Sequence, residues 1–466
     1  MMIHRTFLIA CSAMALTACA SGPDYRPRPI PAAAAGSFVN GGGPAVAVSQ
    51  PVGDWWRLYR DPVLDRLVTD ALAANTDIRV AVARLAKARA VLREEQGARE
   101  PQVGLSGSSQ YGRLPGPSSP GVNRTDVQVN AGIDVAYEVD LFGRVSRGIE
   151  AAGGDAGAAL ADVDAVRVAI ASDTALAYAD AVSSAERITV AQHIVRLLDQ
   201  SLALTERRHQ VGLANGLDTA RIAALRDQRL AEVPVLQAQR QAALLRLATL
   251  TGRAPADLPS DVAVRLTSLQ LDRPIPIGDG AGLLARRPDV RAAERRLAAA
   301  TARIGVATAD LYPRITLGGS IGSSGAGLGN ILGANPLTWL IGPLINWTAN
   351  RSAARARVAG AEADTQAALA TFDGTILEAL QETETALSNY RQALQRREAL
   401  NAARADAETA TRITRARQRE GDISSLELLD SERTAADAEA ALAEQDARIT
   451  SAQVSLFRAL GGGWGA

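Results

Sequence analysis

Alternating apolar and polar residues predict a long strand at about 126–141. Apolar side chains such as Val129 and Val135 occupy the odd positions, and polar side chains such as Asp134 occupy most of the even ones. A period of two places the two sets on opposite faces of a strand. The segment is longer than the mean strand of soluble proteins, about 5–6 residues, and long enough to cross a bilayer. We expect one face toward lipid and the other toward a wet interior.

Three more segments are expected to be strands of the same sheet. Two of them also alternate, whereas the last is apolar on both faces. The Gly-, Ser- and Pro-rich segments 112–126 and 323–336 predict hairpin loops. These three further strands are expected at about 102–112, 314–322 and 337–347.

Two segments predict helices of exceptional length. Residues 158–211 contain no Gly or Pro and would span about 80 Å, and residues 351–420 would span about 105 Å. Leu380 and Leu387 belong to a seven-residue spacing that is typical of coiled-coil packing. Pro234 is expected to kink or interrupt the helix that returns from the first of these segments.

The chain consists of two similar halves. Residues 75–79 are echoed by 287–291 and residues 101–105 by 313–317, a shift of 287 − 75 = 212 in both cases. Each half reads as helix, two strands, very long helix, turn and helix, which gives four strands per chain. Single-chain barrels begin at eight strands, and eight leave an interior filled by side chains. A conducting pore therefore needs at least three copies of the chain, with twelve strands.

The N-terminal residues predict export and lipidation. An apolar run at 6–18 follows Arg5 and ends in Leu16-Thr17-Ala18-Cys19, which resembles a bacterial lipoprotein signal. The alternative is an ordinary signal peptide with a chance Cys. Ala20, rather than Asp, favours delivery to the outer membrane. The Pro-, Ala- and Gly-rich residues up to 52 are expected to form an extended strap with no core of its own.

The domain organisation follows from these features. The expected divisions are a signal peptide at 1–18, a lipid-anchored linker at 19–52, a first repeat at 53–252, a Pro-rich connector at 253–282, a second repeat at 283–460 and a tail at 461–466.

Charge and candidate chemistry give little indication of catalysis. The 50 basic and 50 acidic residues cancel, so nothing attracts nucleic acid. His193 and His209 are sixteen positions apart (209 − 193), which fits no metal site or catalytic triad. The Gly/Ser run at 322–329 lacks the Lys-Ser/Thr ending of a phosphate-binding loop. We expect neither an enzyme nor a bound cofactor, apart from covalent lipid on Cys19.

Several motifs resemble one known family. Residues 283–294 (Leu-Leu-Ala-Arg-Arg-Pro-Asp-Val-Arg-Ala-Ala-Glu), Leu311-Tyr312-Pro313 and Trp55-Trp56 are similar to segments of the TolC-like outer-membrane efflux lipoproteins, NodT/OprM branch. The resemblance implies a mainly α-helical fold with a membrane β-barrel. It implies a homotrimer with a twelve-stranded barrel in the outer membrane and a helical tunnel through the periplasm. The connector would lie midway along the helices.

The resemblance also implies a function. The protein would be a passive channel that exports drugs or other small toxic solutes. Its partners would be a periplasmic adaptor, an inner-membrane pump of the resistance-nodulation-division type and outer-membrane lipid. Two alternatives stay open: a lipid-anchored structural or adhesive trimeric fibre without transport, and a lipoprotein enzyme.

The turns at 211–218 and 420–427 are the candidate sites. Gly212 and Gly421 suit a left-handed residue at a helix end, and Asp218 or Ser424 is expected to cap the next helix. Asp422 departs from the family's pattern. The resemblance implies adaptor docking at these turns. The docking residues would be Gly212, Leu213, Asp218, Arg221, Gly421 and Leu426.

Two acidic residues after the second turn match positions that narrow the tunnel in the family. In a trimer, Glu427 and Asp430 would each form a ring of three carboxylates that favours cations. An ion pair of Arg221 with Asp218 or Asp430 is a candidate latch for the closed end. Arg412, Arg415 and Arg419 are read equally well as a solvated helix face.

Overall fold

The computed structural model describes residues 21–29, 31–51, 53–115, 123–326 and 337–462. Two compact units can be distinguished. The first contains residues up to Arg28, residues 84–160 and residues 292–373. The second contains residues 29–83, 161–291 and 374–466. The longest helices contribute to both units.

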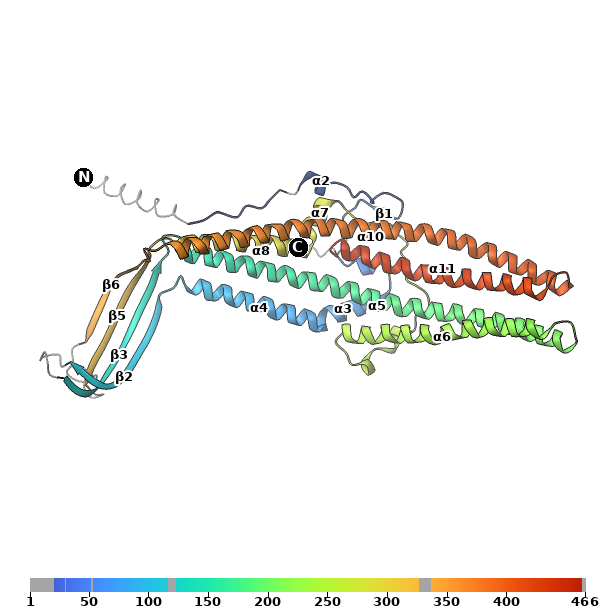
Figure 1. Ribbon diagram of the computed structural model, residues 1–466, viewed down its shortest axis with the longest axis horizontal. Helices are drawn as coiled ribbons and strands as arrows, with labels where there is room; N and C mark the ends of the chain where they lie inside the picture. Colours follow the sequence, from blue (N-terminus) through green and yellow to red (C-terminus); the bar gives the residue numbers. More distant parts are fainter. Residues whose placement is uncertain (1–20, 30, 52, 116–122, 327–336, 463–466) are drawn as a thin grey trace. The chain divides into compact units, whose positions relative to one another are not determined.

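The first unit carries a four-stranded antiparallel sheet (Figure 1). Its order is β2-β3-β5-β6, so β2 and β6 each have one neighbour among the described strands. Ile133 in the middle of β3 lies between Leu105 of β2 and Ile321 of β5. The four predicted strands are therefore confirmed. Their bounds are Gln102–Pro115 (β2), Asn123–Val139 (β3), Arg314–Ala326 (β5) and Thr338–Asn346 (β6).

The strands reach further into the predicted loops than expected. Pro115 still pairs with Asn123, and β5 continues to Ala326. Backbone pairing needs no particular side chain, so Gly- and Ser-rich residues extend the ladder instead of ending it. At its other end β3 stops at Val139, before the predicted Leu141, because the Asp140 carboxylate accepts the first backbone N–H groups of the next helix, from Val145 and Ser146.

Two helices are at least as long as the sequence indicates. They are α5 (Arg144–Gln210, 67 residues) and α10 (Ser352–Glu420, 69 residues). α5 begins well before Ala158, where we expected it, and runs through Gly154 and Gly157. A Cβ atom at Gly154 would lie 2.9 Å from the Cβ of Ala299 in α8 (Pro288–Ala309), so these glycines allow close helix approach.

The return helices are of equal length. α6 (Gly216–Leu250) and α11 (Ser425–Ala459) each have 35 residues. The expected interruption at Pro234 is not found, since α6 continues through it. Val233 and Leu236, on either side of the proline, are buried against Ala191 of α5, and this packing supports the helix. No helix in the described part of the chain combines the length and the apolar character needed to span a membrane.

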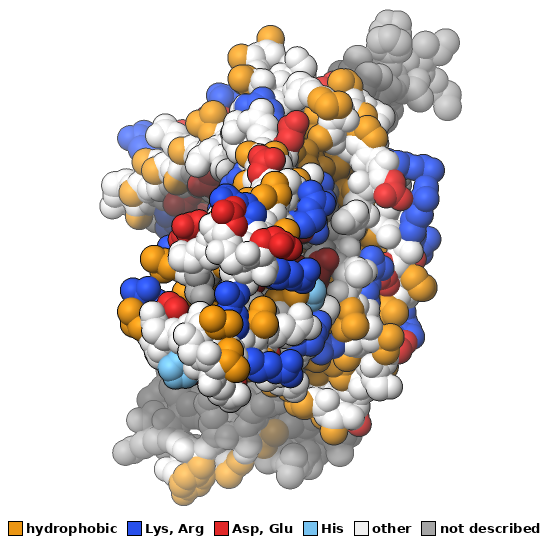
Figure 2. All heavy atoms as spheres, turned by 90° about the vertical axis from the view of Figure 1, so that its right-hand side faces the viewer, with side chains coloured by type: hydrophobic (Ala, Val, Ile, Leu, Met, Phe, Trp, Pro, Cys, Tyr) orange, Lys and Arg blue, Asp and Glu red, His pale blue; other side chains and the backbone are white. Residues whose placement is uncertain are grey.

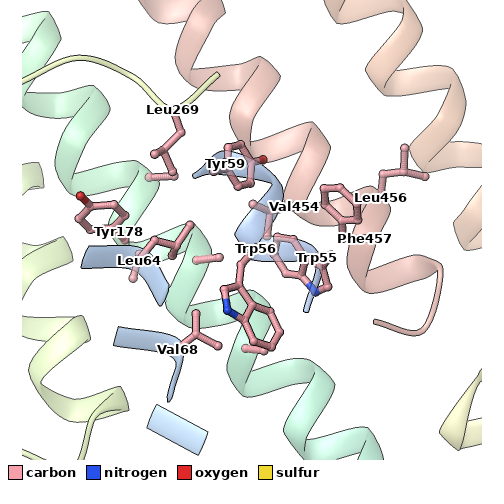
Figure 3. Packing of buried hydrophobic residues seen from close by; sticks show 14 of the residues in the cluster. Trp55, Trp56, Tyr59, Leu64, Val68, Tyr178, Leu269, Val454, Leu456 and Phe457 are labelled. Carbon is pink, nitrogen blue, oxygen red and sulfur yellow. The ribbon is translucent and has the colours of Figure 1, made fainter. Parts of the chain in front are cut away.

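The core of the second unit gathers around Trp55 (Figure 3). This side chain is 1% exposed and stacks on Phe457 of α11, with 4.6 Å between ring centroids. It lies in the short 3-10 helix Trp55–Tyr59, which leads into α3 (Pro62–Ala74). Asp61 caps α3 and also accepts from the Tyr178 hydroxyl. The first unit also contains α4 (Thr76–Gly97) in part.

The Pro-, Ala- and Gly-rich segment up to residue 52, expected to be an extended strap, packs in part against the rest of the second unit. It contains a short helix, α2 (Ala32–Ala35), and a strand, β1 (Val46–Ala47), that pairs with β4 (Ile275–Pro276) in the connector. Phe38 is buried in the core of the second unit. Glu384 of α10 accepts hydrogen bonds from the backbone of Val39 and Asn40. Apolar burial and paired backbone groups therefore hold residues 38–47 in place.

Candidate functional site

The turn between α5 and α6 is built from a left-handed glycine. Gly212 has φ +78°, and the next amide, of Leu213, donates to the Arg208 carbonyl at 2.7 Å. This bond satisfies a carbonyl that the ending helix leaves open. The cap of α6 is Asn215, whose side chain accepts from the Asp218 amide at 2.9 Å. The expectation that Asp218 caps this helix is wrong, because a cap lies before the first helical residue and Asp218 already lies in the first turn.

The turn between α10 and α11 repeats this design. Gly421 has φ +79°, and the Asp422 amide donates to the Arg417 carbonyl. Ser424 caps α11 by accepting from the Glu427 amide at 3.3 Å, as expected. Asp422 forms an ion pair with Arg417 at 2.7 Å.

Both turns expose large apolar side chains. Leu213 is 70% exposed and Leu426 is 52% exposed, and Val211 and Leu217 are similarly accessible. Figure 2 is seen from the end that carries the turns and shows hydrophobic side chains scattered among arginines and carboxylates. Four large apolar side chains are thus accessible to a partner at the two turns.

Glu427 and Asp430 lie on the first turns of α11 and are exposed. Their spacing of three places them on the same helix face. Arg221 is also exposed, and among the described residues it forms no ion pair with Asp218 or Asp430 of the same chain. The latch, the docking residues and the constriction stay predictions.

The sequence analysis did not predict a buried ion pair between α10 and α11, near the second turn. The Glu432 carboxylate of α11 is buried, pairs with Arg415 of α10 at 2.9 Å and accepts from the Ser201 hydroxyl of α5 at 2.6 Å. Arg415 is therefore not simply part of a solvated face. The one available sequence signal was the position of Glu432 on the apolar side of α11, between Leu428 and Ala436, and this signal does not identify Arg415 or Ser201 as its partners.

A cavity of about 550 Å³ adjoins this ion pair. Ile194 and Leu198 of α5 contribute apolar walls, and Arg412 and Arg419 contribute charge. Burial raises the pKa of Glu439 in the same wall, while the nearby His193 partly opposes the shift.

The two histidines are not brought together by the fold. His193 lines this cavity, whereas His209 lies at the C-terminal end of α5 with its Nδ1 2.9 Å from the Ala214 carbonyl oxygen. Within the described ranges, no three His, Cys, Asp or Glu side chains are grouped as a metal ion would require.

The Arg-Arg-Pro-Asp motif has a structural role. Arg287 is buried, forms ion pairs with Asp289 at 2.6 Å and Glu382 at 2.7 Å, and donates to the Ala459 carbonyl. It thereby joins the start of α8 to α10 and to the end of α11. Burial favours the neutral form of Asp289, but the hydrogen bonds and the positive charge of Arg287, together with backbone N–H groups, outweigh it and lower the pKa of this carboxyl.

The architecture is that of an outer-membrane channel protein. One structural match is the outer-membrane channel OprN, with a TM-score of 0.90 and 36% sequence identity over 96% of this chain and all (100%) of that one. The family described as "Outer membrane efflux protein" matches residues 67–253 and 282–462, and this chain belongs to that family.

Curated relatives agree over nearly the full length. Outer membrane protein OprJ of Pseudomonas aeruginosa is 31% identical over 462 residues, 97% of this chain and 94% of the relative. The antibiotic efflux pump outer membrane protein ArpC of Pseudomonas putida is 30% identical over 98% of this chain and 95% of its own length. The protein is an outer-membrane efflux component with a TolC-like fold that extends into the periplasm.

Proposed function

We propose that three copies of the chain form a passive conduit for efflux. The observation that carries this proposal is the sheet with two open edges. Among the described strands, β2 and β6 each pair on one side only. Unpaired backbone groups are costly in lipid, and four strands are too few to close a barrel. Three chains supply twelve strands, enough to surround an aqueous path.

The two faces of the sheet support a barrel wall. Outward-facing apolar side chains are widely exposed, with Leu105 at 87% and Ile341 at 76%. Polar residues on β2 and β3 face one another, as in the hydrogen bond from Asn130 to the Ser108 hydroxyl at 3.2 Å. Such a sheet presents one face to lipid and one to water in the assembled trimer.

The proposed entrance lies at the two turns. The exposed Leu213 and Leu426 would contact a periplasmic adaptor, with Gly212, Gly421, Asp218 and Arg221 shaping or flanking that surface. An inner-membrane pump of the resistance-nodulation-division type would supply the energy. The chain itself would catalyse no reaction. Small toxic organic solutes, antibiotics among them, are the proposed cargo, and the similarity to ArpC, an antibiotic efflux pump outer membrane protein, supports this choice.

The proposed constriction is formed by Glu427 and Asp430. Both carboxylates are exposed on the first turns of α11. Three-fold assembly would repeat each of them around the axis, and the resulting rings would attract cations. At the closed end, Arg221 is proposed to form the latch ion pair with Asp218 or Asp430.

The proposed anchor is Cys19, which lies outside the described residues. The apolar run before it and the Ala at position 20 support acylation and delivery to the outer membrane. The acyl chains would be the only covalently bound group, and no other cofactor is proposed.

Single-channel recording in planar bilayers tests the conduit. The purified protein should pass a cation-selective current. Glu427→Gln combined with Asp430→Asn should reduce that selectivity, whereas Glu398→Gln, at an exposed position of α10 away from the turn, should not. An absence of current in every variant would favour the alternative, a trimeric structural fibre with a filled centre.

A further inference from the structure

Residues 21–25 pack closely against α5 and α8 in the first unit, at a site that we call the Arg147 seat. The Ser21 amide donates to the Phe142 carbonyl at 3.0 Å, just beyond the end of β3. Gly22 has φ +89°, and a Cβ atom there would lie 2.5 Å from the Cα of Gly305 in α8. Only glycine combines this backbone conformation with such a close approach. The segment therefore lies directly against α8.

Arg147 of α5 is the polar centre of the seat. Its side chain is 7% exposed. The Nε atom donates to the Ser21 carbonyl at 3.3 Å, and Nη2 forms an ion pair with Asp24 at 2.5 Å. A buried guanidinium requires such acceptors. The N-terminal segment supplies those on Ser21 and Asp24, and Glu150 of α5 supplies a further one to Nη1 at 2.7 Å. The Tyr25 hydroxyl adds a bond to Glu294 of α8 at 3.1 Å.

Aromatic side chains lie at the ends of the strands, close in sequence to the residues that form this seat. Phe142 stacks on Tyr312 with 4.5 Å between ring centroids, and Arg351 lies 5.1 Å from the ring centroid of Trp347. Tyr312 and Trp347 are partly exposed and flank β5 and β6 at the ends that continue into helices. Aromatic residues at the end of membrane strands are typical of the membrane–water interface.

We infer that the Arg147 seat holds the acylated end of the chain at the membrane interface, beside the base of the strands. Cys19 is two peptide units before Ser21, and consecutive Cα atoms are about 3.8 Å apart, so their Cα atoms are separated by at most about 8 Å. The acyl chains thus enter the leaflet next to the sheet rather than at the end of a long tether. This inference rests on the lipid anchor proposed above.

Spin-label mobility tests the seat. A nitroxide is attached at Pro23→Cys in the mature protein in lipid bilayers, where the Cys19 thiol is blocked by lipid. The label should be immobilised in the parent. Gly22→Ala should shorten its rotational correlation time roughly tenfold, toward the nanosecond motion of free termini. Gly36→Ala is the matched control, because Gly36 has φ −75° and open space around its Cβ position.

A second variant guards against misfolding. Asp24→Ala removes one ion-pair partner of Arg147. Because the Asp24 side chain is 76% exposed, its loss should increase the mobility of the label by a smaller factor than Gly22→Ala does. A label that is already mobile in the parent overturns the seat. A Gly36→Ala effect equal to that of Gly22→Ala does the same, because the seat would then have no specific role.

Acyl analysis separates the seat from the anchor. Mass spectrometry of the N-terminal peptide should find acyl chains in the parent and none in Cys19→Ala. An immobilised label on a chain without acyl groups would refute the lipid anchor but leave the contacts of residues 21–25 intact. A mobile label on an acylated chain would refute the seat alone.

Discussion

Arg415→Ala should loosen the end of the helices that carries the two turns. The substitution leaves the buried Glu432 carboxylate with Ser201 as its remaining hydrogen-bond donor among the described residues. Breaking a buried ion pair costs about 3–5 kcal/mol. The Arg415 side chain is 35% exposed, so water screens part of the interaction, and we expect about 2 kcal/mol.

Hydrogen exchange measures this cost locally. About 2 kcal/mol corresponds to a fall of roughly 30-fold in amide protection. The fall should be confined to peptides from the C-terminal end of α10 and the N-terminal end of α11, because Arg415 and Glu432 join these two segments.

Arg404→Ala is the matched control on the same helix. Arg404 pairs with Glu408 at 2.7 Å, but the two side chains are 41% and 52% exposed. Such a pair contributes about 0.3–0.5 kcal/mol, so protection should change by no more than about twofold. Equal effects of the two substitutions would refute the reasoning that burial gives the Arg415–Glu432 pair its weight.

Three further predictions concern the helices. Gly154→Ala should lower the thermal unfolding temperature, because the new Cβ would press on the backbone of α8. Gly153→Ala, with open space around the new Cβ, should be neutral or stabilising by about 0.5–1 kcal/mol. Equal shifts of the two variants would contradict the proposed close packing. Asn215→Ala should destabilise the start of α6 by about 1 kcal/mol, and Asp218→Ala by less; hydrogen exchange of that turn would show the reverse order if Asp218 were the cap. Because the pKa of Asp289 is lowered in the folded state, the ionised carboxylate contributes its full stabilisation above about pH 4, and this stabilisation is lost as the pH falls through the folded-state pKa. Asp289→Asn should remove this part of the acid dependence of unfolding. An unchanged acid-unfolding curve in the variant would refute the role of Asp289.

Regular patterns in the sequence were sufficient for the main elements. The period of two from Val127 onward reflects a strand with two different surroundings, and this property is local. The length of α10 is equally local, because the chain from Ser352 to Glu420 contains no residue that ends it. The glycines of the two turns were found because a left-handed helix end has few alternatives to glycine.

Other features depend on contacts between distant residues. Gly154 reads as a helix breaker until Ala299 is seen to lie against it, and Pro234 reads as an interruption until the packing of its neighbours is known. Glu432 is one acidic residue among many in the sequence, and only the fold buries it against Arg415 and Ser201. The packing of Phe38 likewise needs a surface formed by remote segments. Such contacts cannot be predicted from the composition of the neighbouring sequence.

The number of chains in the folded particle tests the central claim most directly. Native mass spectrometry of the mature protein, extracted from the outer membrane in mild detergent, should show three copies, because β2 and β6 need partners from neighbouring chains. A fully folded single chain under the same conditions would contradict the proposed conduit.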